Sequence, residues 1–582
     1  MVRYRRFILL VWVAFLWAAC TPRQFPAARV ASPTTDVEYL SSATLEGRYP
    51  GTDGDSLAAD YIRQSFRNMG LQWMSDNGFQ PFSLVTSVTL GDSNLMVVNG
   101  EQRLPGKAFL PYSFSSLSFF AGEVVFAGYG FDIHQDSLIW NDFEGVDVSG
   151  KWVLLLKGDP EPEQQESLFE PYSGERAKVL AALDHGASGV LFTGGPAFNE
   201  QDQLQDIFFD KNSSSYPVPV FQITRALADQ ILSSAGKDVA ALEGELNRER
   251  RPHSLVTDSR VEARADVRPS TVVTRNVVAF LPGKDPALRN EYIVVGAHYD
   301  HLGWGGPGSG SRRSDTTAIH YGADDNASGV AAVLEIARQA VAAGGTRRSL
   351  VFAAFGAEEM GLIGSRHLAE NPPFDLKKTT AMFNFDMVGR LDTLSKGLSI
   401  SGTQTSAESE EMLARLNPGF NLALTGDGFG PSDHASFYMQ NIPVFYFTTG
   451  AHGDYHTPGD TFDKINTSGI GSIAAYAWAL VQETGNRDEM LSFREAGAKM
   501  KRSRGGRFKV TLGIMPDFAG LEKNGLRVDA VTSGKPADLG GIHKGDIITS
   551  IDGKAVGNIY DYMNRLKSFT EGQTISVDVL RN

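Results

Sequence analysis

Between residues 275 and 450, short apolar runs alternate with longer amphipathic segments, and this alternation leaves few possible folds. The apolar runs are NVVAFLPG, EYIVVGAH, RSLVFAAFGAEE, TAMFNFDMVG and IPVFYFTTG, and the clearest amphipathic segment is GVAAVLEIARQAVAAG. Uncharged runs of strand length that alternate with helices are typical of a sheet covered by helices on both faces. The pattern predicts an α/β domain with a mixed, largely parallel sheet.

Acidic and imidazole side chains follow the predicted strands or precede a predicted helix. In open α/β sheets, ligands bind beyond the carboxyl ends of the strands, where these positions converge. Taken singly, Asp325 could be a helix N-cap, His298 a core histidine and Glu358 part of a solvated strand end. Taken together, nitrogen and oxygen ligands without a thiolate suit a catalytic zinc site, and the number of carboxylates favours two metals that share one carboxylate. The residues are His298, Asp300, Asp324, Asp325, Glu358, Glu359, Asp386 and His456.

Five stretches in this region resemble the successive motifs of one enzyme family. HYDHLG, GADDNASG, FGAEEMGLIGS, FNFDMVG and DYHTPGD are similar to the motifs of the co-catalytic di-zinc exopeptidases, which include aminopeptidases S and Y and glutamate carboxypeptidase. The resemblance covers residues 275–480 and implies the zinc exopeptidase fold with two Zn²⁺ ions. It implies that Asp325, rather than Asp324, bridges the metals, and that the peptide bond after it is cis. The other implied ligands are His298 and Asp386 at one metal, and Glu359 and His456 at the other.

The resemblance also implies catalytic roles. Glu358 would be the general base that deprotonates a zinc-bound water to hydroxide, and Asp300 would accept the second N–H of His298 and fix its tautomer. Tyr455, Asp433 and His434 are candidate substrate contacts; for the last two, support of the metal loops is an equally weighted alternative. Because five ligands already fill the expected set, four histidines are not expected to bind metal: His301, His320, His367 and His452.

Two accessory domains are expected around this catalytic part. Short β-rich runs such as GEVVFAGYG and GKWVLLLKGDP resemble a protease-associated domain inserted at 113–264, which divides the catalytic domain into 30–112 and 265–488. The segment 505–582, with PADLGGIHKGDIITSIDG, resembles a PDZ domain. Its expected partner is a peptide C-terminus, and the alternative is an internal brace. The loop expected to receive that carboxylate is Leu512, Gly513, Ile514 and Met515.

The first residues predict export. In 1–20, arginines precede an apolar run that is short for a membrane span and ends in Cys20, the single cysteine of the 582-residue chain. This segment resembles a bacterial lipoprotein signal, which implies a lipid anchor on Cys20 and a periplasmic or outer-membrane location; a plain signal peptide is the alternative. A formal charge of −14 argues against a nucleic-acid partner.

The sequence therefore predicts an exported zinc-dependent exopeptidase that acts on peptides, and an aminopeptidase is the leading hypothesis. The alternatives are a carboxypeptidase or dipeptidase of the glutamate carboxypeptidase type, a glutaminyl cyclase, and a receptor-like module without catalysis. A receptor-like module without catalysis should lack metal ligands or the general base, whereas this sequence has all five ligands and Glu358.

Overall fold

The structure is a computed structural model. It describes residues 31–496 without 136–137, 165–166 and 212–214, and residues 510–581 without 517–521, 523, 532–533 and 571. Cys20 and the predicted export segment lie outside these residues. Within the described part of the chain, no helix has both the length and the apolar character needed to cross a membrane.

The first lobe is built on a nine-stranded mixed sheet with the order β1-β13-β15-β14-β16-β19-β17-β18, in which β2 also pairs with β13. The central pairs β14–β15, β14–β16 and β16–β19 are parallel, whereas β13 and β17 pair antiparallel with β15 and β19. The predicted largely parallel α/β sheet is confirmed. Its strands are β1 (Gln72–Trp73), β2 (Phe79–Leu90), β13 (Val267–Leu281), β14 (Tyr292–His298), β15 (Ser349–Phe355), β16 (Thr379–Phe385), β17 (Gly397–Ser401), β18 (Asn421–Thr425) and β19 (Val444–Thr448).

Helices cover both faces of this sheet because its central strands are apolar on both sides. One face packs against α1, α2, α6 and α10 in a large core, and the other packs against α7 and α9 in a smaller one. The helices of this lobe are α1 (Pro33–Leu40), α2 (Asp53–Asn68), α6 (Gly329–Ala342), α7 (Ile363–Glu370), α8 (Ser409–Leu416), α9 (His434–Tyr438) and α10 (Thr467–Asn486), with short turns η1 (Ala43–Leu45) and η5 (Ala323–Ser328).

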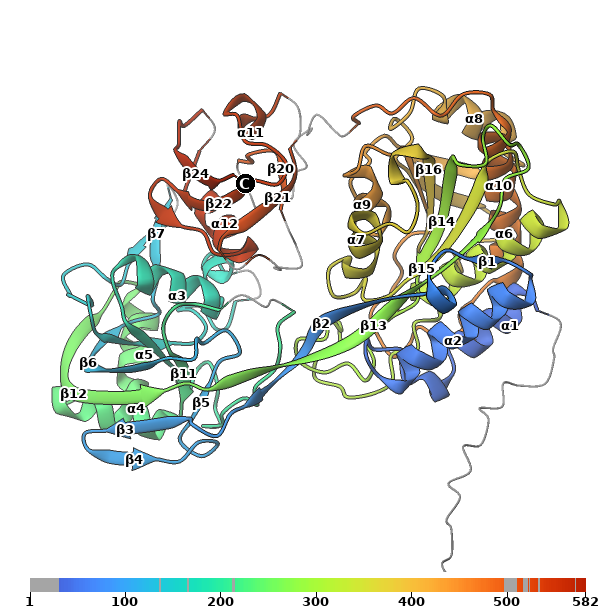
Figure 1. Cartoon of the computed structure of the whole chain (residues 1–582). Coiled ribbons are helices and arrows are strands. Elements are labelled where there is room, and N and C mark those ends of the chain that lie inside the picture. The colour runs from blue at the N-terminus through green and yellow to red at the C-terminus, as the bar shows by residue number, and fades with distance from the viewer. Residues whose placement is uncertain are drawn as a thin grey trace, which may run out of the picture.

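The second lobe contains an eight-stranded sheet with the order β4-β3-β12-β6-β9-β10-β11-β5. The sequence division at residue 113 left β3, β4 and β5 in the catalytic part, but they pair within this second sheet. The long strands β2 and β13 run as a ribbon between the two lobes (Figure 1), so the chain enters the second lobe before residue 95. The strands and helices are β3 (Leu95–Val98), β4 (Glu101–Arg103), β5 (Phe109–Pro111), β6 (Phe119–Ala127), β9 (Trp152–Leu156), β10 (Gly189–Thr193), β11 (Val220–Ile223), β12 (Ser254–Arg264), α3 (Glu175–Asp184), α4 (Arg225–Leu232) and α5 (Val239–Glu249), beside the hairpin β7 (Asp132–Gln135) and β8 (Leu138–Asn141).

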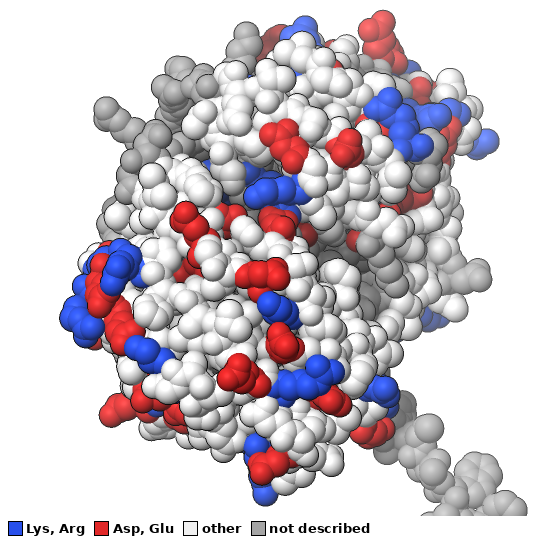
Figure 2. All heavy atoms as spheres, turned by 90° about the vertical axis from the view of Figure 1, so that its left-hand side faces the viewer, with Lys and Arg blue, Asp and Glu red and all other residues white. Residues whose placement is uncertain are grey.

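The third unit is a small C-terminal β domain with its own apolar core. It lies over the second lobe in Figure 1, with helix α12 beside α3. Its elements are β20 (Ile514–Pro516), β21 (Leu526–Val531), α11 (Pro536–Leu539), β22 (Ile547–Ile551), β23 (Lys554–Ala555), α12 (Ile559–Lys567) and β24 (Val577–Leu580). Figure 2 views the molecule from the left-hand side of Figure 1, where the second lobe and the C-terminal domain lie. Among the described residues, acidic and basic side chains are intermixed over this face.

Candidate metal centre

The predicted site residues come from five segments that meet at the carboxyl ends of the central strands. His298 is the last residue of β14, Glu358 and Glu359 follow β15, and Asp386 follows β16. Asp325 lies in η5, directly before α6, and the peptide bond from Asp325 to Asn326 is cis, as the resemblance implied. Parallel strands end at the same edge of a sheet, so residues far apart in sequence share one small volume here.

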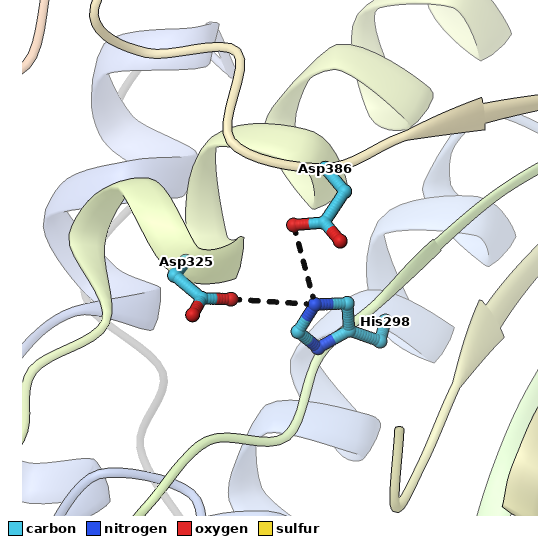
Figure 3. Close-up of side chains that lie close together, drawn as sticks. All are labelled: His298, Asp325 and Asp386. Carbon is cyan, nitrogen blue, oxygen red and sulfur yellow. Dashed lines mark ion pairs between the residues drawn. The ribbon is translucent and has the colours of Figure 1, made fainter. Parts of the chain in front are cut away.

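His298 is the centre of a first cluster. Its Nε2 atom lies 3.4 Å from Oδ1 of Asp325 and 3.5 Å from Oδ1 of Asp386. Figure 3 shows the two carboxylates directed at the same ring nitrogen from different elements. All three side chains are buried, and their ligand atoms are close enough together to hold one metal ion.

The other oxygen of Asp325 faces a second cluster. Its Oδ2 atom lies 3.1 Å from Nε2 of His456, and Oε1 of Glu359 lies 3.2 Å from the same nitrogen. His301 also belongs here, because its Nδ1 atom is 2.9 Å from Oε1 of Glu359 and 3.8 Å from Oδ2 of Asp325. Asp325 therefore offers one oxygen to each cluster, which is the geometry of a bridging carboxylate.

His301 is the main difference from the sequence reasoning, which set it aside because five ligands seemed sufficient. The spacing of two imidazoles in HYDH was the available signal, but only the structure places the second ring beside Glu359. The other three excluded histidines have different partners. His452 Nε2 is 3.2 Å from Asp324 Oδ2, His320 Nε2 is 2.8 Å from Ser311 Oγ, and the His367 ring lies beside Phe82.

In the metal-free protein, the neighbouring carboxylates keep His298 and His456 protonated. Burial disfavours a charged imidazole at His298, but the negative charges of Glu358 and Asp386 outweigh it and raise the pKa of His298 well above its ordinary value. At His456, burial is likewise outweighed, here by Asp325 and Glu359, and the pKa rises to about 10. The cluster therefore requires positive charge.

Two divalent cations fit this donor set. Buried carboxylates are stable only when paired or bound to metal, and imidazole nitrogens with carboxylate oxygens are the ligands of catalytic zinc. The protonated imidazoles supply the balancing charge in the protein alone, and metal ions at the same two positions would replace those protons. His298, Asp325 and Asp386 would hold one ion, and Asp325, Glu359 and His456 the other.

Neighbouring groups fix the orientation of these ligands. Nδ1 of His456 lies 3.0 Å from the carbonyl of Gly310, which directs Nε2 into the cluster. Asp300 is the predicted acceptor for the second ring nitrogen of His298, and it meets this nitrogen through its main-chain oxygen, 3.3 Å from Nδ1. Its carboxylate lies 3.7 Å from Nδ1, beyond hydrogen-bond length, and instead accepts the backbone N–H groups of Glu358 and Glu359 at 2.9 and 3.2 Å. Asp300 thus holds the turn that carries both glutamates.

Two supporting residues were missed in the sequence. Arg48 is 1% exposed and donates to the carbonyls of Tyr299, Tyr321 and Gly322 at 2.7, 2.8 and 2.9 Å, which ties together the loops before Asp300 and Asp324. Asp460 accepts the N–H groups of Asp324 and Asp325 at 2.8 and 3.1 Å. Asp460 is the last residue of the motif DYHTPGD, so the sequence offered a signal for it. No residue near Arg48 in the sequence indicated the role of this arginine.

Glu358, the predicted base, lies at the edge of the first cluster. Its Oε2 atom is 3.9 Å from Nε2 of His298, and its side chain retains 11% exposure, so it faces the space between the clusters and solvent. Burial raises the pKa of Glu358 well above its ordinary value; the charge of His298 opposes this, and that of Asp433 adds to it. A carboxyl group in this environment can hold a proton.

The three candidate substrate residues have different surroundings. Tyr455 is half-buried and stacks on the His456 ring, with centroids 3.8 Å apart. Asp433 is buried, and burial raises its pKa to about 7. His434 is buried and stacks on Tyr446, and burial lowers its pKa to about 3. Asp433 and His434 are thus both fully buried, and Tyr455 is the one of the three nearest open space.

The two clusters at the strand ends share one carboxylate, an arrangement that suits two metal ions. Residues 276–481 match the sequence model of Peptidase family M28, and residues 500–582 match that of a PDZ domain. The chain therefore contains an M28 peptidase domain followed by a PDZ domain, as predicted from the motifs.

Curated relatives are similar over part of their length. Leupeptin-inactivating enzyme 1 of Streptomyces exfoliatus is 28% identical over 50% of this chain and 65% of its own. Aminopeptidase YwaD of Bacillus subtilis is 30% identical over 34% of this chain and 42% of its own. The chain thus spans less than two thirds of the length of these relatives. Among solved structures, the zinc aminopeptidase BSAP of Bacillus subtilis has a TM-score of 0.47 and 20% identity, over 78% of this chain and 95% of that one.

Proposed function

We propose that the protein is a zinc-dependent aminopeptidase that hydrolyses the N-terminal residues of peptides. The observation that carries the proposal is Asp325, which directs one oxygen to each of two histidine–carboxylate clusters with Glu358 beside them. The name of a relative, Aminopeptidase YwaD, supports the same activity. The expected metal ligands are His298, Asp325, Asp386, Glu359 and His456, and His301 lies close enough to the second cluster to act with them.

Two zinc ions, when bound, supply Lewis-acid polarisation of a carbonyl group and a water nucleophile that is active near neutral pH. Glu358 takes the proton from the attacking water and returns it to the leaving amine, so one side chain serves as base and then as acid. Asp300 holds Glu358 in place through its backbone N–H. Tyr455, stacked on His456, is the group that we propose contacts the substrate.

The activity is tested with purified protein lacking residues 1–20 and supplied with zinc. Peptides with free N-termini are compared with the same peptides N-acetylated, and products are identified by mass. Release of the first residue from the free peptides alone is the expected result. Cleavage of the acetylated peptides from the other end would instead indicate a carboxypeptidase, and no cleavage of either set would reject peptidase activity.

We also propose that residues 1–20 direct export and that Cys20 carries a lipid anchor. Arginines before a short apolar run and a single cysteine at its end support this proposal. The test is expression of the full chain and of Cys20→Ser in a bacterium, followed by membrane fractionation. Membrane recovery of the native chain and loss of that recovery in the variant are expected; equal recovery would reject the anchor.

A further inference from the structure

The second lobe is in direct contact with the metal centre. Nζ of Lys211 lies 2.8 Å from the main-chain oxygen of Glu359. Three residues earlier, Phe208 packs so closely against the loop of Gly308 that a side chain at Gly308 would meet its ring. That loop also contains Gly310, whose carbonyl holds His456. Segment 208–211 of the second lobe therefore packs against the turn that carries Glu359 and the loop that holds His456.

A cavity of about 410 Å³ is lined by part of this segment and lies between the second lobe and the PDZ domain. This is the size of ordinary ligand pockets. Its apolar lining includes Tyr112, Phe114 and Phe208 from the second lobe and Met563 from α12. Phe208 lines the cavity and also contacts the catalytic loop, so the cavity and the metal centre flank the same short segment.

The PDZ domain is held over this cavity by specific contacts. The Tyr216 hydroxyl donates to Oδ1 of Asp561 at 2.9 Å, and Nη2 of Arg565 donates to Oδ1 of Asp184 at 2.8 Å. The amide of Gln135 donates to the carbonyl of Lys567 at 2.6 Å. Helix α12 is therefore a fixed wall of the cavity.

The charge of the lining is negative. Its acidic residues are Glu170, Glu175, Asp206 and Asp210, and its basic residues are Arg176 and Lys567, which leaves two negative charges in excess.

Both basic groups are already engaged. Arg176 forms a two-bond pair with Asp210, at 2.7 and 3.1 Å, and Nζ of Lys567 donates to Asn564 at 2.8 Å. Among the described residues, neither Glu175 nor Asp206 has an ion pair within 4.0 Å. Two lysines, Lys157 and Lys178, lie near Glu175. Both are buried, and burial lowers the pKa of each.

Carboxylates around aromatic rings form an environment that attracts a cation. We propose that this cavity is a subsite for the downstream part of the peptide substrate and that it selects a basic side chain there. The proposal rests on the proposed aminopeptidase function. The residues after the first would lie along segment 206–211, which contacts the metal centre through Lys211 and lines the cavity through Phe208.

The test compares three substrates with the same N-terminal residue: an aminoacyl amide, a hexapeptide with lysines at positions 4–6, and a hexapeptide with alanines there. The lysine peptide should have a KM lower than that of the alanine peptide by about three- to tenfold, the range expected for one or two partly exposed charge pairs. Its kcat should be similar, and added salt should reduce the difference.

The variant Glu175→Gln/Asp206→Asn should remove this preference and leave the aminoacyl amide unaffected. Glu123→Gln, at an exposed glutamate of β6 outside the cavity, is the matched control and should behave as the native protein. Binding of the labelled lysine peptide, measured by fluorescence anisotropy with the metal-loaded protein, should weaken in the double variant by the same factor and give a readout independent of turnover.

The two proposals fail in distinguishable ways. Cleavage of the amide without any preference for the lysine peptide, or a preference that persists in the double variant, overturns the subsite and leaves the aminopeptidase intact. If the lysine peptide changes the rate on the amide without competing for the metal centre, the cavity binds a separate effector and the substrate subsite is rejected. If no substrate is cleaved, the aminopeptidase is rejected, and the subsite with it.

Discussion

Glu358 is the residue on which the proposed chemistry depends. Replacement by Gln keeps the shape but removes the basic oxygen, so we expect kcat to fall by a factor of about 10² to 10⁴. Because the expected metal ligands are different residues, zinc content should stay near that of the native protein. Steady-state kinetics and metal analysis check this. Glu411→Gln, at an exposed glutamate of α8, is the control, and an active Glu358 variant would exclude Glu358 as the base.

Protonation of the histidines predicts how metal uptake depends on pH. The pKa of His456 is raised to about 10, so the protein alone holds this proton at pH 7. A metal binds only the neutral ring, so zinc uptake should release protons, and affinity should rise as pH increases from 6 to 9. Calorimetric titration in buffers of different ionisation enthalpy measures the release. Binding that is independent of the buffer and of pH would contradict the assignment of His456.

Arg48 has a structural role that no neighbouring residue can take over. Its buried guanidinium donates to carbonyls of two metal loops, so Arg48→Ala leaves those acceptors unpaired and removes a positive charge near Asp325 and Asp300. We expect the free energy of unfolding to fall by about 3 kcal/mol or more. Arg48→Lys should recover only part of it, since an ammonium cannot reach all the acceptors. Denaturant unfolding measures the stability of both variants, and an Arg48→Ala variant as stable as the native protein would contradict this role.

At the level of elements, the junction of η5 and α6 sets the position of Asp325. At Gly329, the first residue of α6, an added methyl group would lie 2.2 Å from Oδ1 of Asn326 and 2.3 Å from the carbonyl of Phe385. Gly329→Ala should therefore separate η5 from the end of β16 and weaken zinc binding. The neighbouring strand end carries Asp386, so both metal positions are affected.

A glycine in another helix provides the control for this prediction. Gly244 lies in α5, and an added Cβ there meets nothing within 4 Å. Gly244→Ala should stabilise the fold by about 0.5–1 kcal/mol through helix propensity and leave zinc affinity unchanged. Zinc titrations and thermal unfolding of both variants make the comparison, and equal zinc affinity in Gly329→Ala would refute the role of this junction.

At the level of the whole molecule, the PDZ domain is docked on the second lobe through α12. Arg565 and Asp184 form a largely buried ion pair between them, with side chains 7% and 14% exposed. Arg565→Ala leaves Asp184 without this partner, and we expect the PDZ domain to detach and the radius of gyration from small-angle scattering to increase. Arg581→Ala removes an ion pair to Asp546 within the PDZ domain and should leave the radius of gyration unchanged. Unchanged scattering of both variants would show that other contacts suffice for docking.

The sequence was sufficient to predict the α/β sheet and the types of residue at its edge. Runs such as EYIVVGAH encode strand, burial and a terminal ligand within eight residues, because strand length and side-chain chemistry are local properties. The same holds for the adjacent glutamates after β15 and for the helix start at Asp325. These residues do converge in the structure, at distances that suit two metal positions.

Contacts between distant segments could be seen only in the folded chain. Arg48 and Tyr299 are 251 residues apart in sequence, and Lys211 and Glu359 are 148 apart. His301 was discounted by counting ligands, although its ring lies beside Glu359. Residues 95–111, which form β3 to β5, were placed in the catalytic domain but pair in the second sheet, because strand pairing is not encoded in a single run. Local patterns thus specified which groups reach the active edge, and long-range packing specified which atoms face each other.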